Sequence, residues 1–159
     1  MIVVSNTSPI SNLAAIGQLD LLRHFYQRIV IPAAVYRELL ADNGSHPGAI
    51  IQTLNWIDVR TVQNQALVTA LRLELDEGEA AAIALAQELG ADLILLDERL
   101  GRAVAARFGL RFIGLLGVLV EAKQQGLLPI IKPALNALRQ AGFWISPKLY
   151  SQVSRAVGE

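Results

Sequence analysis

Hydrophobic positions along the chain form two kinds of segment in alternation. Short apolar runs rich in β-branched residues predict strands over residues 2–5, 28–31, 56–59, 92–96 and 112–114. Between them lie longer segments in which apolar residues recur every three or four positions, as in helices. A repeated strand–helix order is typical of a parallel sheet covered by helices, so we predict an α/β fold.

Turn and capping residues mark the limits of the predicted helices. Asn6-Thr7-Ser8-Pro9 is a helix-entry signal, and two short helices follow on either side of Gly17. Asp76 opens a later helix that Gly90 closes. Further helices are expected over residues 33–42, 63–73 and 98–108, with a loop over residues 43–48. From about residue 115 the chain is expected to be helical to its end, with breaks at Gly126, Pro129, Gly142 and Pro147.

The run from Asp92 to Leu96 is the strongest strand signal. From Leu93 to Leu96 the run is continuously apolar rather than alternating, which indicates a strand buried on both faces. The run ends at Asp97.

Composition narrows the picture to one small domain, residues 1–159, within the usual size of a single core. Cysteine is absent, which excludes disulfides, a thiolate nucleophile and a cysteine-rich zinc site. The sequence starts MIVVSN without a basic leader, and its apolar runs fall short of the roughly 18 residues of a membrane span, so we expect a cytoplasmic protein.

Charge and hydropathy bear on partners. The chain has 14 basic and 14 acidic residues, so any nucleic-acid contact must be local. Hydrophobic residues make up 53% of the sequence and the mean hydropathy is +0.40, which suggests more apolar surface than one core can cover. We expect a homodimer, a partner protein, or both.

Candidate chemistry lies where the predicted strands end. In a parallel sheet, ligands gather beyond the carboxyl ends of the strands, where Asn6 and Asp97 stand. Glu79 lies in the first turn of the helix before the buried strand, and Glu38 borders the apolar stripe of its own helix. Clustered carboxylates repel one another unless they share a cation.

Each acidic residue also has a purely structural interpretation. Asp76 and Glu79 have the spacing of a capping box, Asp97 can cap the next helix, and Glu98 suits the positive end of that helix. Glu38 can reach solvent or pair with an arginine. Only the joint arrangement favours a site for Mg²⁺ or Mn²⁺, cations that prefer oxygen ligands and activate water for phosphodiester hydrolysis.

Four segments in order resemble the PIN domains: VVSNTSPI at the N-terminus, VIPAAVYREL around Glu38, DEGEAAAIALA around Glu79 and ADLILLDERLGRAVA around Asp97. A fifth, GLLGVLVEAKQQGLL, continues the likeness toward the C-terminal third. Within the PIN domains, the chain is similar to the VapC-type toxin ribonucleases, whose N-terminus reads close to VVSDTSPL.

The resemblance implies a three-layer αβα sandwich with a central parallel sheet and an acidic pocket that binds Mg²⁺ or Mn²⁺. It also implies endoribonuclease activity on RNA, as the toxin of a toxin–antitoxin pair. Its acidic ligand positions carry over to Glu38, Glu79, Asp97 and Glu98, and its hydroxyls beside the first ligand to Thr7 and Ser8.

Asn6 departs from this pattern, because relatives carry aspartate there. An amide oxygen can still bind a hard cation but brings no charge, so we expect weak metal binding and reduced turnover. The alternative is a catalytically silent PIN-fold module that binds RNA or a protein partner.

The arginines, the histidines and the apolar tail are the remaining candidates for function. Arg99 and Arg102 can share a helix face and meet a phosphate, or form an ordinary solvated face. His24 and His46 lack the spacing of a metal site. No glycine-rich phosphate loop is present, which disfavours a dinucleotide cofactor or another small-molecule site. The apolar tail, residues 142–153, either packs on the sheet or meets a dimer or antitoxin partner.

Overall fold

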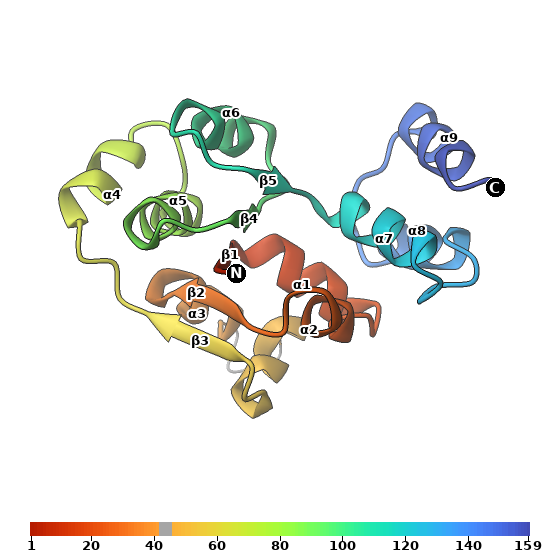
Figure 1. Cartoon of the computed structure of the whole chain (residues 1–159), viewed down its shortest axis with the longest axis horizontal. Helices are drawn as coiled ribbons and strands as arrows, with labels where there is room; N and C mark the ends of the chain where they lie inside the picture. Colours follow the sequence, from red (N-terminus) through yellow and green to blue (C-terminus); the bar gives the residue numbers. More distant parts are fainter. Residues whose placement is uncertain (42–45) are drawn as a thin grey trace.

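The computed structural model describes residues 1–41 and 46–159, and a single five-stranded sheet lies at its centre (Figure 1). All neighbouring strands pair in parallel, in the order β3-β2-β1-β4-β5. The strands are β1 (Val3–Ser5), β2 (Ile29–Pro32), β3 (Ile57–Arg60), β4 (Leu93–Leu95) and β5 (Phe112–Ile113). Helices cover both faces of the sheet, which confirms the predicted three-layer αβα sandwich.

The central strands β1 and β4 are buried on both faces. Val3 pairs with Leu93 and Ser5 with Leu95. As in any strand, successive side chains point to opposite sides of the sheet. Val3 and Leu95 belong to one hydrophobic cluster, while Val4 and Ile94 belong to the other. The continuous apolar run of β4 therefore serves two cores, as its pattern predicted.

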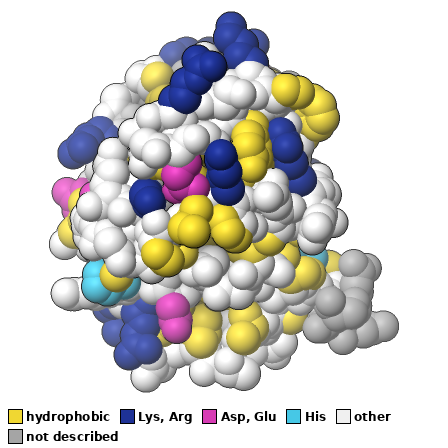
Figure 2. All heavy atoms as spheres, turned by 90° about the vertical axis from the view of Figure 1, so that its right-hand side faces the viewer, with side chains coloured by type: hydrophobic (Ala, Val, Ile, Leu, Met, Phe, Trp, Pro, Cys, Tyr) yellow, Lys and Arg dark blue, Asp and Glu magenta, His cyan; other side chains and the backbone are white. Residues whose placement is uncertain are grey.

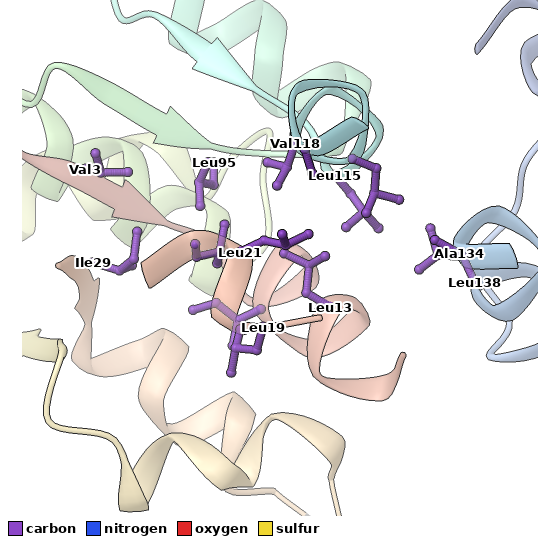
Figure 3. Packing of buried hydrophobic residues seen from close by; sticks show 14 of the residues in the cluster. Val3, Leu13, Leu19, Leu21, Ile29, Leu95, Leu115, Val118, Ala134 and Leu138 are labelled. Atoms are coloured by element: carbon purple, nitrogen blue, oxygen red, sulfur yellow. The ribbon is translucent and has the colours of Figure 1, made fainter. Parts of the chain in front are cut away.

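One face of the sheet is covered by α1 (Thr7–Ala15), α2 (Asp20–Tyr26) and α7 (Leu115–Gln124). Figure 3 shows strand residues of this cluster facing helix residues, among them Val3, Ile29, Leu95, Leu13, Leu21 and Val118. Helix α8 (Lys132–Gln140) adds Ala134 and Leu138 to the same cluster, and α9 (Pro147–Ala156) follows it.

The opposite face is covered by α4 (Gln65–Leu71), α5 (Glu77–Leu89) and α6 (Arg99–Arg107). Helix α5 is buried from Gly78 to Ala86, and its many alanines let it lie close to the sheet beneath its neighbours. Its N-cap residue is Asp76, whose Oδ1 accepts a hydrogen bond from Glu79 N at 2.8 Å. It ends at Gly90, whose φ of +60° provides the left-handed C-cap.

Helix α3 (Ala33–Leu39) and the segment after it differ from the sequence prediction. The helix ends at Leu39 rather than near residue 42. Residues 42–45, which include the last residue of the predicted helix and the first part of the predicted loop, lie outside the described part of the chain. Pro47 and Gly48, also predicted as loop, begin the 3-10 helix η2 (Pro47–Thr53). The His46 side chain caps η2 by accepting from Gly48 N at 3.0 Å, which a propensity pattern does not reveal.

In the described residues, no helix is both long and apolar enough to cross a membrane.

Candidate active site

The carboxyl ends of β1 and β4 lie side by side at the middle of the sheet. Asn6 follows β1 directly, and its backbone N–H donates to Leu95 O at 3.1 Å. Asp97 follows two residues after that carbonyl. Parallel pairing therefore brings together two candidate residues that stand 91 positions apart in the sequence.

Asn6 is buried, with 5% of its surface exposed. It occupies the N-cap position of α1, yet its side chain makes no capping hydrogen bond. Among the described residues, its Oδ1 is the only buried side-chain oxygen or nitrogen without a hydrogen-bond partner. A buried acceptor without a donor is costly, so this amide oxygen is open to a ligand.

Asp97 is held by two hydrogen bonds from elements far from it in sequence. Its Oδ2 accepts from Ser8 Oγ at 3.1 Å, and its Oδ1 accepts from Leu115 N at 2.7 Å. Asp97 thus caps the start of α7 and does not cap α6, where Glu98 takes the N-cap position without a side-chain capping bond. Burial raises the pKa of Asp97, and the hydrogen bonds from Leu115 and Ser8 only partly oppose that rise.

Glu38 reaches the site from α3. Its Oε2 accepts a hydrogen bond from Thr7 Oγ1, which lies next to Asn6. A Cβ atom added to Gly78 would stand 2.6 Å from both carboxylate oxygens of Glu38. Gly78 therefore leaves the room in which this carboxylate lies.

Glu79 follows Gly78 in the first turn of α5 and is buried, with 7% of its surface exposed. Burial raises the pKa of Glu79 to about 8, and a hydrogen bond with Asp76 and the negative charges of Asp76 and Glu98 add to the rise. A Cβ atom on Gly101 would come within 2.8 Å of Glu79 Oε2, so a second glycine accommodates a second carboxyl group. The capping role predicted for Asp76 is confirmed, whereas Glu79 lies buried beside other acids.

A cavity of about 290 Å³ lies over these residues. Five of the predicted site residues line it: Asn6, Thr7, Ser8, Glu38 and Glu98. Three further lining residues were not predicted as site residues: Ser11, Asn12 and Asp76. Ser11 and Asn12 follow Thr7 and Ser8 by one helical turn, and Asn12 Nδ2 donates to Ser8 Oγ at 3.0 Å. That spacing of four was the signal that could have found them.

The acidic side chains share this region without forming a closed cluster. Over residues 1–41 and 46–159, no three His, Cys, Asp or Glu side chains are grouped as a metal ion would require. Glu38 is bonded to Thr7, Glu79 to Asp76, and Asp97 to Ser8. These three carboxyl groups each have a hydrogen-bond partner within the protein.

The two arginines occupy different settings. Arg102 Nε donates to Leu96 O at 2.8 Å, and its Nη2 lies 4.0 Å from Asp97 Oδ1, which places a guanidinium beside the acidic site. Arg99 is exposed in the first turn of α6.

His24 is exposed and packs edge-on against Phe25. His46 caps η2, and its Nε2 lies 3.4 Å from Ser11 Oγ, at the wall of the acidic cavity.

Comparison with known proteins gives a family. The DUF3368 family, described as PIN domain, matches residues 2–159. No curated protein and no solved structure matches the chain. The match spans nearly every residue and agrees with the five-stranded parallel sheet. The chain belongs to the PIN-domain family, a fold of the nuclease type.

Proposed function

We propose that the protein is a metal-dependent endoribonuclease that hydrolyses RNA phosphodiester bonds at the cavity beside Asn6. The observation that carries this proposal is the unpartnered, buried Oδ1 of Asn6 in a cavity also lined by Glu38 and Glu98. An orphaned oxygen among carboxyl groups matches the donor set that hard divalent cations take.

The residues fit a weakly held Mg²⁺ or Mn²⁺. The ligands we assign are Asn6, Glu38, Glu79, Asp97 and Glu98, all of which offer oxygen. Mutual repulsion and burial already oppose ionisation of Glu79, and a nearby cation would reverse that effect. Among the described residues no three acids are grouped as a metal requires, and Asn6 carries no charge, so we expect affinity only in the millimolar range.

When bound, such an ion supplies an activated water and stabilises charge on a phosphoryl oxygen. The chain's own residues position the substrate. Thr7 and Ser8 place hydroxyls at the cavity wall, and each would donate to a phosphate oxygen on releasing its present acceptor, Glu38 or Asp97. Arg102 beside Asp97, with Arg99 on the same helix, provides positive charge for the phosphate.

A comparison of wild type with Asn6→Asp on single-stranded RNA in Mn²⁺ tests the proposal. The variant restores a carboxylate at the position that has lost it, so we expect roughly tenfold or greater cleavage over wild type. Asp97→Asn in the Asn6→Asp background is the matched control and should abolish cleavage. If neither wild type nor Asn6→Asp cleaves, the nuclease proposal fails.

Asn6 itself favours a second candidate, a catalytically silent PIN-fold module that binds RNA or a protein partner through the same cavity. Its neutral side chain removes the central charge of the site. Under this alternative, wild type binds RNA but does not cleave it at any Mn²⁺ concentration, while Asn6→Asp does cleave.

For the biological setting, we propose the toxin of a toxin–antitoxin pair, acting in the cytoplasm and neutralised by a cognate antitoxin protein. The likeness of the N-terminal segment VVSNTSPI to that of VapC-type toxins supports this setting. Induced expression should arrest growth, and Asp97→Asn should relieve the arrest at equal protein level.

A further inference from the structure

A second cavity, of about 460 Å³, adjoins the acidic site. Asp97, Arg102, Trp144 and Leu149 are among the residues that line it. Asp97 also accepts a hydrogen bond from Ser8, which lines the acidic cavity, so a residue of the second cavity is joined directly to the wall of the first.

Trp144 is the most exposed aromatic side chain along this path, at 80%. Its neighbour Ile145 is 2% exposed and packs in the core, so the backbone around Trp144 is anchored while the indole is not covered. Phe112 lines the same cavity, is 40% exposed and lies under the Arg102 guanidinium at 5.6 Å. The cavity is thus bordered by one open aromatic side chain, Trp144, and by one aromatic ring covered in part by an arginine, Phe112.

Positive charge accompanies these aromatic groups. A third cavity, of about 400 Å³, shares Phe143 and Trp144 with the second and adds Arg139. The chain has no net charge, but residues 115–159 carry five Lys and Arg against two Glu. Figure 2 shows Lys and Arg side chains between exposed hydrophobic ones on the side of the molecule where α7–α9 lie.

From this arrangement we infer that Trp144 is a base-stacking platform for single-stranded RNA whose backbone enters the acidic site past Asp97. Interleaved aromatic and basic groups bind single strands because bases stack on the rings while phosphates meet the cations. A base within a duplex is already stacked and cannot take this place. The inference rests on the proposed ribonuclease function and names its substrate as unpaired RNA.

Trp144 is also the natural probe, because the other tryptophan, Trp56, is 4% exposed and out of reach of ligand. Wild type and Trp144→Phe are titrated in EDTA with an adenosine octanucleotide RNA, and binding is followed by anisotropy of the labelled RNA. Tryptophan emission is recorded in parallel. The difference in emission between the two proteins isolates the Trp144 signal.

We expect the octanucleotide to quench the Trp144 emission at saturation, whereas an abasic ribose-phosphate octamer of equal charge leaves it unchanged. Trp144→Ala should weaken binding about tenfold, and Trp144→Phe should retain most of the affinity. Leu73→Ala, which removes an 88% exposed side chain just after α4, is the matched control and should bind as wild type.

Two results would overturn the inference: bound octanucleotide with unchanged Trp144 emission, or equal quenching by a duplex of the same sequence. In the first case we would assign the exposed Trp144 to contact with a protein partner. Quenching without cleavage by any variant in Mn²⁺ would instead refute the proposed nuclease and leave the stacking platform standing.

Discussion

Glu79 and Asn6 lie buried near the carboxyl end of β1, and both destabilise the metal-free protein. Glu79 is a buried carboxyl group close to other acidic groups, and Asn6 Oδ1 is a buried acceptor without a donor. Such costs persist in a fold when a ligand compensates them, which is why functional sites concentrate perturbed groups. At the residue scale, the site is therefore recognisable by what is unfavourable in it.

Replacement of Glu79 by Gln should stabilise the metal-free protein near pH 8. The pKa of Glu79 is about 8 in the fold against an ordinary 4.5, so the unfolded chain loses its proton first as pH rises. The wild-type free energy of unfolding therefore falls between about pH 4.5 and pH 8, and Gln escapes that loss. We expect a gain of about 1–2 kcal/mol at pH 8 and none below pH 4.5, measured by urea unfolding in EDTA.

Glu77→Gln is the control for this measurement. Glu77 lies in the same helical turn, but its side chain is 44% exposed and pairs with Arg37 at the surface. Its replacement should leave the unfolding free energy nearly unchanged at both pH values. A Glu79→Gln protein that is less stable than wild type at pH 8 would show that the carboxylate is favourably held.

At the scale of elements, the start of α5 combines structural and functional parts. Asp76 caps the helix, Gly78 makes room for Glu38, and Glu79 is one of the proposed ligands. These three roles fall within four residues. The local sequence pattern is therefore that of a capping box, and it does not reveal the proposed site.

Asp76→Ala should lower the unfolding free energy by about 1 kcal/mol, because it removes the bond to Glu79 N. Asp76→Asn keeps an acceptor and should recover most of that loss. Thermal unfolding of both variants separates the cap from the charge. Equal destabilisation by Ala and Asn would contradict a capping role.

Gly78→Ala should leave stability unchanged or raise it by up to about 1 kcal/mol, because alanine favours a helix more than glycine does. Its Cβ would displace the Glu38 carboxylate, which ends a flexible side chain. Cleavage by the Asn6→Asp protein should consequently fall about tenfold. In a Glu38→Gln background the same change should have little further effect on cleavage, and an undiminished effect would refute the steric explanation.

The sequence was informative where the cause was local. The continuous hydrophobic run predicted β4, and the capping residues Asp76 and Gly90 predicted the two ends of α5. Asp97 was identified as a site residue, but its bond to Leu115, 18 residues later, has no local signature. The early end of α3 and the cap of η2 by His46 likewise depend on neighbours that no periodicity encodes.

At the scale of the whole molecule, the high hydropathy is largely accounted for by two cores. Helix α5 alone buries residues 78–86, and β4 is buried on both faces. Exposed large hydrophobic side chains remain nonetheless, among them Trp144, Leu73 and Ile130.

We propose a homodimer, and light scattering across a dilution series should give about twice the chain mass of 17.2 kDa at micromolar concentration. A constant mass near 17.2 kDa at every concentration would leave the exposed hydrophobic residues to RNA or to a different protein.

The central position of β1 has a consequence for synthesis on the ribosome. Val3 is made 90 residues before its partner Leu93. The Asp97 carboxylate is fixed later still, when Leu115 arrives. Contacts of such long sequence separation close slowly. A nascent chain therefore holds no assembled site until α7 has emerged from the ribosome, which would delay the proposed attack on RNA until that point of synthesis.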